Sequence, residues 1–165
     1  MKHIVLVSVF LSISILFFSC THENATLSPK LKQVESIMYA YPDSALQLLE
    51  HMSVSEIKDP LNHATWCLFM TQAIFKNYVE QSDSLLNIAY SYFMKQDNLQ
   101  RKALALYLKG GFHEERKESE IAVNYLTQAS EWADKTSDYR LSSLIWAHLG
   151  SIYTFSNLAY AEDAL

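Results

Sequence analysis

The chain has 165 residues, enough for one modest domain, and half of them are hydrophobic, which is ample for a core. Glycine and proline occur only three times each, which argues against a β-sandwich or barrel with its many turns. The formal net charge is −5 and the sequence contains no cluster of lysine and arginine, so the surface has no electrostatic reason to bind nucleic acid. Strong helix formers dominate the composition, and we expect an all-α fold.

The first nineteen residues have the three-part pattern of a secretory signal. Lys2 and His3 form a short basic start, the run 4–18 is apolar except for three serines, and polar residues follow Cys20. The apolar run is short for a helix that must cross about 30 Å of hydrocarbon. We therefore predict a signal peptide over 1–19 and a linker over 20–30. An ordinary signal peptide with a chance cysteine, or an uncleaved anchor, is the alternative.

The sequence "FFSC" at 17–20 resembles the lipobox of bacterial lipoproteins, although Phe17 replaces the usual leucine. The resemblance implies that Cys20 is lipidated and becomes the first mature residue, with two acyl chains that hold it at a membrane. Cleavage would remove only Lys2 among the charged residues and change the net charge from −5 to −6. We expect a lipid anchor in the envelope of a Gram-negative bacterium. Glu23 is the single acidic residue near Cys20, so a signal for export to the outer surface is not evident. A periplasm-facing position is therefore favoured.

After the linker, apolar residues recur at spacings of three and four, which is the period of amphipathic helices. No segment alternates at period two for long, so no strand is needed. The expected helices are 31–38, 41–52, 63–78, 82–95, 100–115, 117–135 and 141–155, and a further one begins near Leu158.

Two pairs of small residues repeat at the same distance. Gly110 and Gly150 are 40 residues apart, and so are Ala89 and Ala129. A repeat of this length in a helical chain predicts helix hairpins that stack side by side.

Four residues of the last full helix, Trp146, Leu149, Gly150 and Tyr153, have the W-x-x-L-G-x-x-Y spacing of a tetratricopeptide repeat. The previous unit resembles the other half of that motif at Ala122, Leu126 and Ala129. The resemblance covers 31–165 and is strongest at 103–153, although the spacing of 40 exceeds the usual length of about 34. "YPDSALQLLE" and "SDSLLNIAYSYF" look like stretches of tetratricopeptide-repeat lipoproteins from Bacteroidetes.

The resemblance implies an α-solenoid of stacked antiparallel hairpins over 31–165. Its small residues let neighbouring helices approach closely. Gly110 and Gly150 are therefore expected to be packed, with Trp146 and Tyr153 filling the space beside Gly150. The unfinished helix over 158–165 makes the domain incomplete at its C-terminus. We expect an N-terminal fragment of a longer product, with coverage by another copy as the alternative.

The sequence shows no catalytic motif, so we do not expect an enzyme or a cofactor. The histidines show no pairing at metal-ligand spacing, and no metal site is predicted. Cys67 lies in the apolar run "TWCLFM" and is predicted to be a buried core thiol. Glu114 and Glu115 are interpreted first as part of a solvated connection.

By the family pattern, the first helix of each hairpin lines a concave groove that binds a protein or peptide. The candidate groove residues carried onto this chain are Asn77, Tyr78, Tyr107, Glu114, Glu115, Ser151, Thr154 and Phe155. The resemblance thus implies a membrane-anchored interaction module, the sensory half of a longer regulatory protein. The alternative is a glycan-binding, nutrient-uptake surface lipoprotein, which ranks lower because such proteins carry large insertions between helices.

Overall fold

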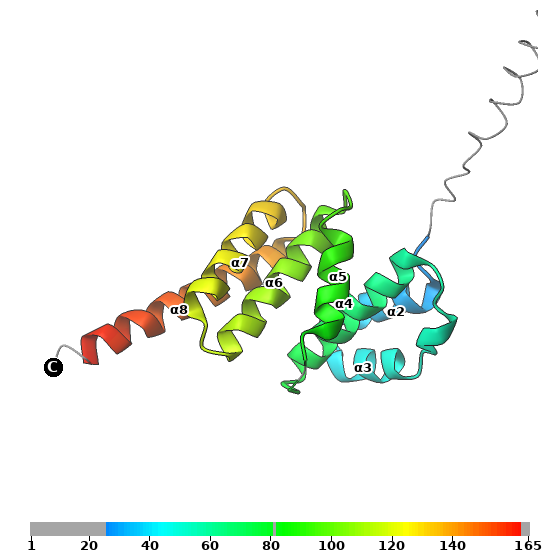
Figure 1. Cartoon of the computed structure of the whole chain (residues 1–165), viewed down its shortest axis with the longest axis horizontal. Coiled ribbons are helices and arrows are strands. Elements are labelled where there is room, and N and C mark those ends of the chain that lie inside the picture. Colours follow the sequence, from blue (N-terminus) through cyan, green and yellow to red (C-terminus); the bar gives the residue numbers. More distant parts are fainter. Residues whose placement is uncertain (1–25, 81, 163–165) are drawn as a thin grey trace, which may run out of the picture.

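The computed structural model describes residues 26–80 and 82–162, and all regular structure in these ranges is helical (Figure 1). The all-α prediction is therefore confirmed for this part of the chain. The predicted signal peptide, Cys20 and most of the predicted linker lie outside it. The elements are α2 (Pro29–Ile37), α3 (Pro42–Glu50), the 3-10 turn η1 (Val54–Glu56), α4 (Pro60–Lys76), α5 (Ser84–Phe93), α6 (Leu99–Glu115), α7 (Ser119–Ala133) and α8 (Tyr139–Glu162).

Four helices begin with a side chain that accepts a hydrogen bond from an otherwise unpaired backbone N–H. The acceptors are Ser28 for α2, Asp59 for α4, Asn98 for α6 and Asp138 for α8. The capping residues of α6 and α8 are 40 positions apart, the same distance that separates Gly110 from Gly150. The 40-residue period is therefore a period of helix starts.

The third predicted helix begins earlier than expected, at Pro60 rather than His63. Proline suits the first position of a helix because the N–H that it lacks has no intrahelical partner there. Pro29 and Pro42 stand at the same place in α2 and α3. All three prolines therefore open helices in this chain.

Consecutive helices pack in pairs, α2 with α3, α4 with α5 and α6 with α7, and each pair also contacts the helix that follows it. A second set of contacts joins alternate helices, α2 to α4, α4 to α6 and α6 to α8. These four helices therefore form a continuous row. In Figure 1 the row runs from the blue α2 to the red end of α8, which projects beyond α6 and α7.

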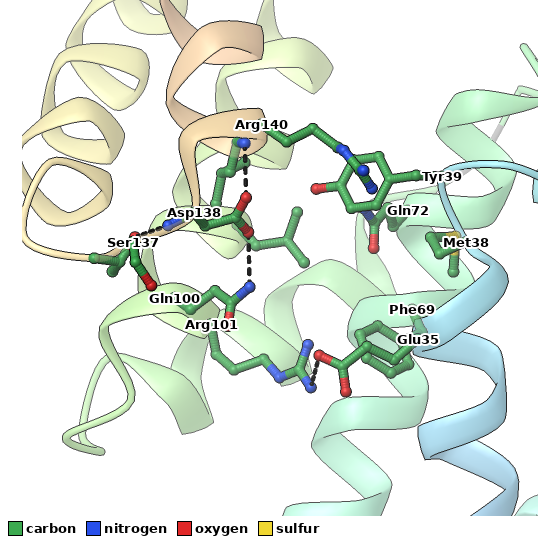
Figure 2. Close-up of a pocket in the computed structure, with 13 residues that line it drawn as sticks. Glu35, Met38, Tyr39, Phe69, Gln72, Gln100, Arg101, Ser137, Asp138 and Arg140 are labelled. Atoms are coloured by element: carbon green, nitrogen blue, oxygen red, sulfur yellow. Dashed lines mark hydrogen bonds and ion pairs between the residues drawn. The ribbon is translucent and has the colours of Figure 1, made fainter.

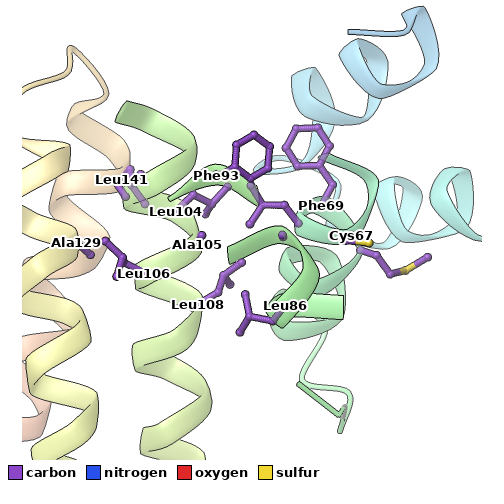
Figure 3. Close-up of a cluster of buried hydrophobic side chains, with 14 of the residues drawn as sticks. Cys67, Phe69, Leu86, Phe93, Leu104, Ala105, Leu106, Leu108, Ala129 and Leu141 are labelled. Carbon is purple, nitrogen blue, oxygen red and sulfur yellow. The ribbon is translucent and has the colours of Figure 1, made fainter. Parts of the chain in front are cut away.

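The core centres on α4 and α6 (Figure 3). Every residue from Ala64 to Ala73 is buried, Cys67 among them with no exposed surface, so the prediction of a buried thiol is confirmed. A helix that is buried on all sides must have neighbours all round it, and α4 contacts α2, α3, α5 and α6. The indole of Trp66 donates a 3.1 Å hydrogen bond to the carbonyl of Leu49, which fastens α4 to the end of α3.

The predicted close packing holds at Gly110 and is wrong at Gly150. A Cβ added at Gly110 would lie 2.6 Å from Cγ of Leu126 on α7, whereas one added at Gly150 would meet nothing within 4 Å. Trp146 and Tyr153 are each 55% exposed, so they do not fill a packed space either. The reason is that α7 covers this face of α6, while no described helix covers the same face of α8.

The helix predicted to begin near Leu158 is not a separate element. α8 is a single helix from Tyr139 to Glu162, because no proline and no turn chemistry interrupts the chain after Phe155. Neither α8 nor any other helix within the described ranges is both long and apolar enough to cross a membrane.

Candidate functional site

A cavity of about 410 Å³ opens between α2, α4, α6 and the start of α8 (Figure 2). It lies along the row of alternate helices, and its walls come from segments up to about a hundred positions apart in the chain. The lining residues are Glu35, Met38, Tyr39, Phe69, Gln72, Gln100, Arg101, Leu104, Thr136, Ser137, Asp138, Arg140 and Leu141.

Arg101 forms one wall of the cavity and is only 8% exposed. Its Nη2 lies 2.8 Å from Oε1 of Glu35, and its guanidinium carbon lies 4.4 Å from the centre of the Phe69 ring. Burial lowers the pKa of Arg101, and the nearby Glu35 carboxylate opposes that effect. Arg101 thus joins α6 to α2 across an aromatic ring of α4.

Tyr39 and Arg140 face each other on the opposite wall (Figure 2). The guanidinium carbon of Arg140 is 4.6 Å from the centre of the Tyr39 ring, and Nζ of Lys76 is 5.0 Å from it. Burial raises the pKa of Tyr39, the Asp138 carboxylate adds to the rise, and a hydrogen bond with Gln72 opposes it. Two cations therefore lie within cation–π distance of one phenol.

Gln100 and Asp138 connect the first turns of α6 and α8. Nε2 of Gln100 donates a 2.7 Å hydrogen bond to Oδ2 of Asp138, whose Oδ1 accepts one from the backbone N–H of Leu141. Both carboxylate oxygens are thereby engaged. In contrast, Arg140 has no ion-pair partner among the residues that the structure describes.

The lining of this cavity combines polar and aromatic groups. It offers amide groups, two aromatic rings and Arg140, which has no carboxylate partner among the described residues. Such groups can hydrogen-bond a backbone and receive a side chain. In residues 26–80 and 82–162, no group of three histidine, cysteine or carboxylate side chains could hold a metal ion.

Of the predicted groove residues, Tyr107 on α6 is the one most enclosed by aromatic neighbours. Its ring centre is 6.1 Å from that of Phe75 on α4 and 5.7 Å from that of His148 on α8, both edge to face. Burial raises the pKa of Tyr107 to about 12, with smaller contributions from Tyr39 and Glu114. Tyr107 therefore lies between aromatic side chains of α4 and α8.

Glu114 and Glu115 differ in their surroundings. Glu114 is half-buried and hydrogen-bonded to Nε2 of His148, so its interpretation as a solvated carboxylate is wrong. α8 passes close to the end of α6, which the sequence pattern did not reveal. Glu115 is exposed, and its pKa is raised by partial burial and by the charges of Glu114 and Glu80.

Asn77 and Tyr78 end α4 in different ways. Nδ2 of Asn77 donates a hydrogen bond to the carbonyl of Ala73, which occupies the side chain in a helix cap. Tyr78 is 95% exposed and has a positive φ of 55°, a conformation that favours glycine. Its side chain is free to meet a partner.

Ser151, Thr154 and Phe155 lie on α8 without joining the cavity. Ser151 is half-buried, Thr154 donates a hydrogen bond to the carbonyl of Gly150, and Phe155 is 67% exposed. The structure thus brings Tyr107, Glu114 and His148 together. The other predicted groove residues are a helix cap, exposed side chains and the half-buried Ser151.

The groove prediction missed the residues around the cavity. It considered the C-terminal halves of α4, α6 and α8, whereas the cavity lies at the start of α6 and α8 and at the end of α2. The capping residues Asn98 and Asp138 could have indicated the cavity, because their 40-residue spacing places the starts of two helices side by side.

Comparison of the chain with protein-family models, with curated proteins and with solved structures finds no match. Its own residues and their arrangement therefore carry the functional argument.

Proposed function

We propose that the chain is a membrane-anchored, tetratricopeptide-like interaction module that holds a protein or peptide in a concave groove and is not an enzyme. In this proposal the pairs α2–α3, α4–α5 and α6–α7 stack as a solenoid, with α8 as the first helix of a further pair. The contacts of α2, α4, α6 and α8 in a continuous row support that arrangement.

The single observation that carries the proposal is the cavity between α2, α4, α6 and α8. Arg140 would pair with a carboxylate of the bound segment, because it has no acidic partner among the described side chains. The exposed Ser137 at the rim and the amide of Gln100 would meet the backbone of the bound segment.

A site-specific photo-cross-linking residue tests the groove. Placed at Ser137 in the full chain and irradiated in intact cells, it should yield an adduct of defined mass. The same residue at Ser91, an exposed position on α5, is the matched control and should not yield that adduct. Arg140→Ala should reduce the Ser137 adduct. Equal adducts at both positions, or none at Ser137, would contradict the groove.

The membrane anchor is a separate part of the proposal and rests on Cys20, which lies outside the described residues. Incorporation of a labelled fatty acid should be lost in Cys20→Ser and retained in Cys67→Ala, because Cys67 is buried in the core. A periplasm-facing position predicts that an impermeant lysine reagent labels the chain only after the outer membrane is opened. Labelling of intact cells would place the module on the outer surface instead.

The same proposal makes the module the sensory half of a longer regulatory protein. The reading frame beyond codon 165 tests this part. A membrane-spanning segment followed by a DNA-binding or kinase-like region would support it, and a stop codon would exclude it.

A further inference from the structure

A separate groove lies between α5 and α7, two helices that contribute no residue to the cavity described above. Its volume is about 470 Å³, within the range of about 300–1,000 Å³ that is typical of small-molecule sites. α6 packs against both α5 and α7, so the three helices around the groove all belong to the described part of the chain. The lining residues are Tyr90, Glu120, Ile121, Asn124, Tyr125 and Gln128.

Two tyrosines from opposite walls meet in this groove. The ring centres of Tyr90 on α5 and Tyr125 on α7 are 6.2 Å apart, edge to face. The ring of His113 on α6 stacks on Tyr125 with 5.2 Å between the ring centres. Nδ1 of His113 is in turn hydrogen-bonded to Oε2 of Glu118 at 2.5 Å. Tyr125 is therefore held in one orientation by a ring that is itself anchored.

Lys109 of α6 supports Tyr90 in a similar way. Its Nζ lies 5.8 Å from the centre of the Tyr90 ring and donates a 2.5 Å hydrogen bond to Oδ1 of Asn87, one turn earlier on α5. Lys109 is only 7% exposed, so it acts from beneath the ring rather than from the surface. Side chains that are ordered before a ligand arrives lose little freedom on binding, which favours affinity.

Polar side chains run along α7 beside Tyr125. Glu120, Asn124 and Gln128 are four positions apart and therefore form one stripe on the helix. Nε2 of Gln128 donates a 2.6 Å hydrogen bond to Oδ1 of Asn124, which leaves Nδ2 of Asn124 as a donor and Oε1 of Gln128 as an acceptor. Neither phenol hydroxyl is hydrogen-bonded to another described residue. The groove thus presents donors and acceptors directly beside aromatic rings.

This lining matches a neutral saccharide better than other small ligands. A sugar has apolar C–H groups that pack on aromatic rings, and hydroxyl groups that both donate and accept hydrogen bonds. An anion is disfavoured, because Glu120 is the one charged residue in the described lining of the groove. A cation is disfavoured as well, because the Lys109 ammonium already lies over the Tyr90 ring. An apolar ligand would leave the amide groups without partners.

We propose that the groove between α5 and α7 binds a neutral saccharide. The C–H groups of the sugar pack against the rings of Tyr90 and Tyr125. Its hydroxyl groups accept a hydrogen bond from Asn124 and donate one to Gln128. The site shares no residue with the cavity between α2, α4, α6 and α8, so the two sites are independent.

An array of neutral and acidic glycans tests the ligand class. The full chain with Cys20→Ser, which removes the predicted lipidation site, is applied to the array. It should be retained by at least one neutral glycan, and isothermal titration with that glycan then gives the affinity. Retention by acidic glycans alone, or by none, would overturn the proposal.

Substitutions in the groove test the location of the site. Asn124→Ala removes a hydrogen-bond donor at an exposed position and should weaken binding by about threefold to tenfold, while Tyr125→Ala should weaken it further. Tyr153→Ala, which removes an exposed tyrosine of α8, is the matched control and should bind like the parent chain. Far-ultraviolet circular dichroism should show that all three variants keep their helices. If Tyr125→Ala does not fold, Asn124→Ala decides the matter, and parental affinity in Asn124→Ala would overturn the proposal.

Discussion

Two glycines at matching positions illustrate how the neighbourhood of a residue decides its effect on stability. Gly110 is buried against α7, while Gly150 has open space around its Cα. The intrinsic cost of glycine in a helix is the same at both positions. The difference lies in what an added methyl group would meet.

Alanine at these two positions should change the free energy of unfolding in opposite directions. Gly110→Ala places a Cβ against Leu126 and should destabilise the fold by about 1–3 kcal/mol through overpacking. Gly150→Ala should stabilise the fold by up to about 1 kcal/mol through helix propensity, because the added Cβ meets nothing within 4 Å. Urea unfolding measures both changes. Equal changes of the same sign would contradict the packing described for α6 and α7.

Tyr78 is a second residue whose backbone conformation conflicts with its side chain. It follows the end of α4 with a φ of 55°, and the N–H of Val79 bonds to the carbonyl of Ile74 in the manner of a Schellman motif. Tyr78→Gly should raise the free energy of unfolding by about 1 kcal/mol, because glycine adopts this conformation without strain and the lost ring is 95% exposed. Thermal or urea unfolding measures the gain, and Tyr78→Ala, which keeps a Cβ, should give little of it. If Tyr78 binds a partner, its glycine variant would be more stable and yet weaker in binding.

At the scale of elements, a few polar groups add to the buried apolar face of α2 in joining it to the rest of the molecule. Asn62 at the start of α4 accepts a 2.7 Å hydrogen bond from the backbone of Ser28 and donates one of 3.0 Å to the carbonyl of Thr26. Arg101 on α6 reaches Glu35 on α2. These interactions hold a nine-residue helix that is too short to be stable alone.

The ion pair between Arg101 and Glu35 should respond unequally to the loss of either partner. The side chain of Arg101 is 10% exposed and that of Glu35 is 40% exposed, so Glu35→Gln leaves a buried cation without its counter-charge. We expect Glu35→Gln to lower the free energy of unfolding by about 1–2 kcal/mol. Arg101→Met should cost less, because methionine can lie on the Phe69 ring and leaves only a half-solvated carboxylate. Urea unfolding of both variants shows which one loses more free energy of unfolding. A larger loss in Arg101→Met would contradict this account.

At the scale of the whole molecule, a buried thiol and a half-buried phenol make the fold sensitive to alkaline conditions. Burial raises the pKa of the Cys67 thiol from 9.0 to about 11 and that of Tyr107 from 10.0 to about 12. A group whose pKa is higher in the folded state than in the unfolded state holds its proton longer in the folded state. The contribution of such a group to the free energy of unfolding is therefore fully present below its pKa in the unfolded state. It is lost as the pH rises through its pKa in the folded state.

The free energy of unfolding should accordingly fall between pH 9 and pH 12, by about 1.4 kcal/mol per unit of pKa difference at most. Urea unfolding at pH 8, 9.5 and 11 measures the decline. Tyr107→Phe keeps the ring and removes the hydroxyl, so the part of the decline above pH 10 should become smaller. If the free energy of unfolding falls equally steeply with pH in this variant, Tyr107 does not contribute to the alkaline decline.

Much of the helical content could be predicted from the chain itself. The spacing of Leu31, Val34 and Met38 identified the buried face of the first helix, and all three are buried. Polar and proline-containing segments marked most helix ends because capping and turn chemistry are local. The start of α4 was misplaced, at His63 rather than Pro60, although proline suits the first position of a helix.

The candidate site was harder to predict, because it depends on which helix ends meet. Tyr39, Arg101 and Arg140 are far apart in the chain and carry no motif, yet the row of alternate helices brings them around one cavity. The prediction instead used positions that a family pattern places on a concave face. Among them, Tyr107 and Glu114 contact other helices of the row through their side chains.

The sequence by itself determined the helical class, most helix boundaries and the burial of residues such as Cys67, because these depend on local propensity and on the period of apolar side chains. Only the tertiary structure decided that Gly110 is packed and Gly150 is open, that Glu114 pairs with His148, and that the cavity forms where α2, α4, α6 and α8 meet. The physical reason is that a helix pattern states which face is apolar, whereas the neighbour that covers that face is supplied by the rest of the fold.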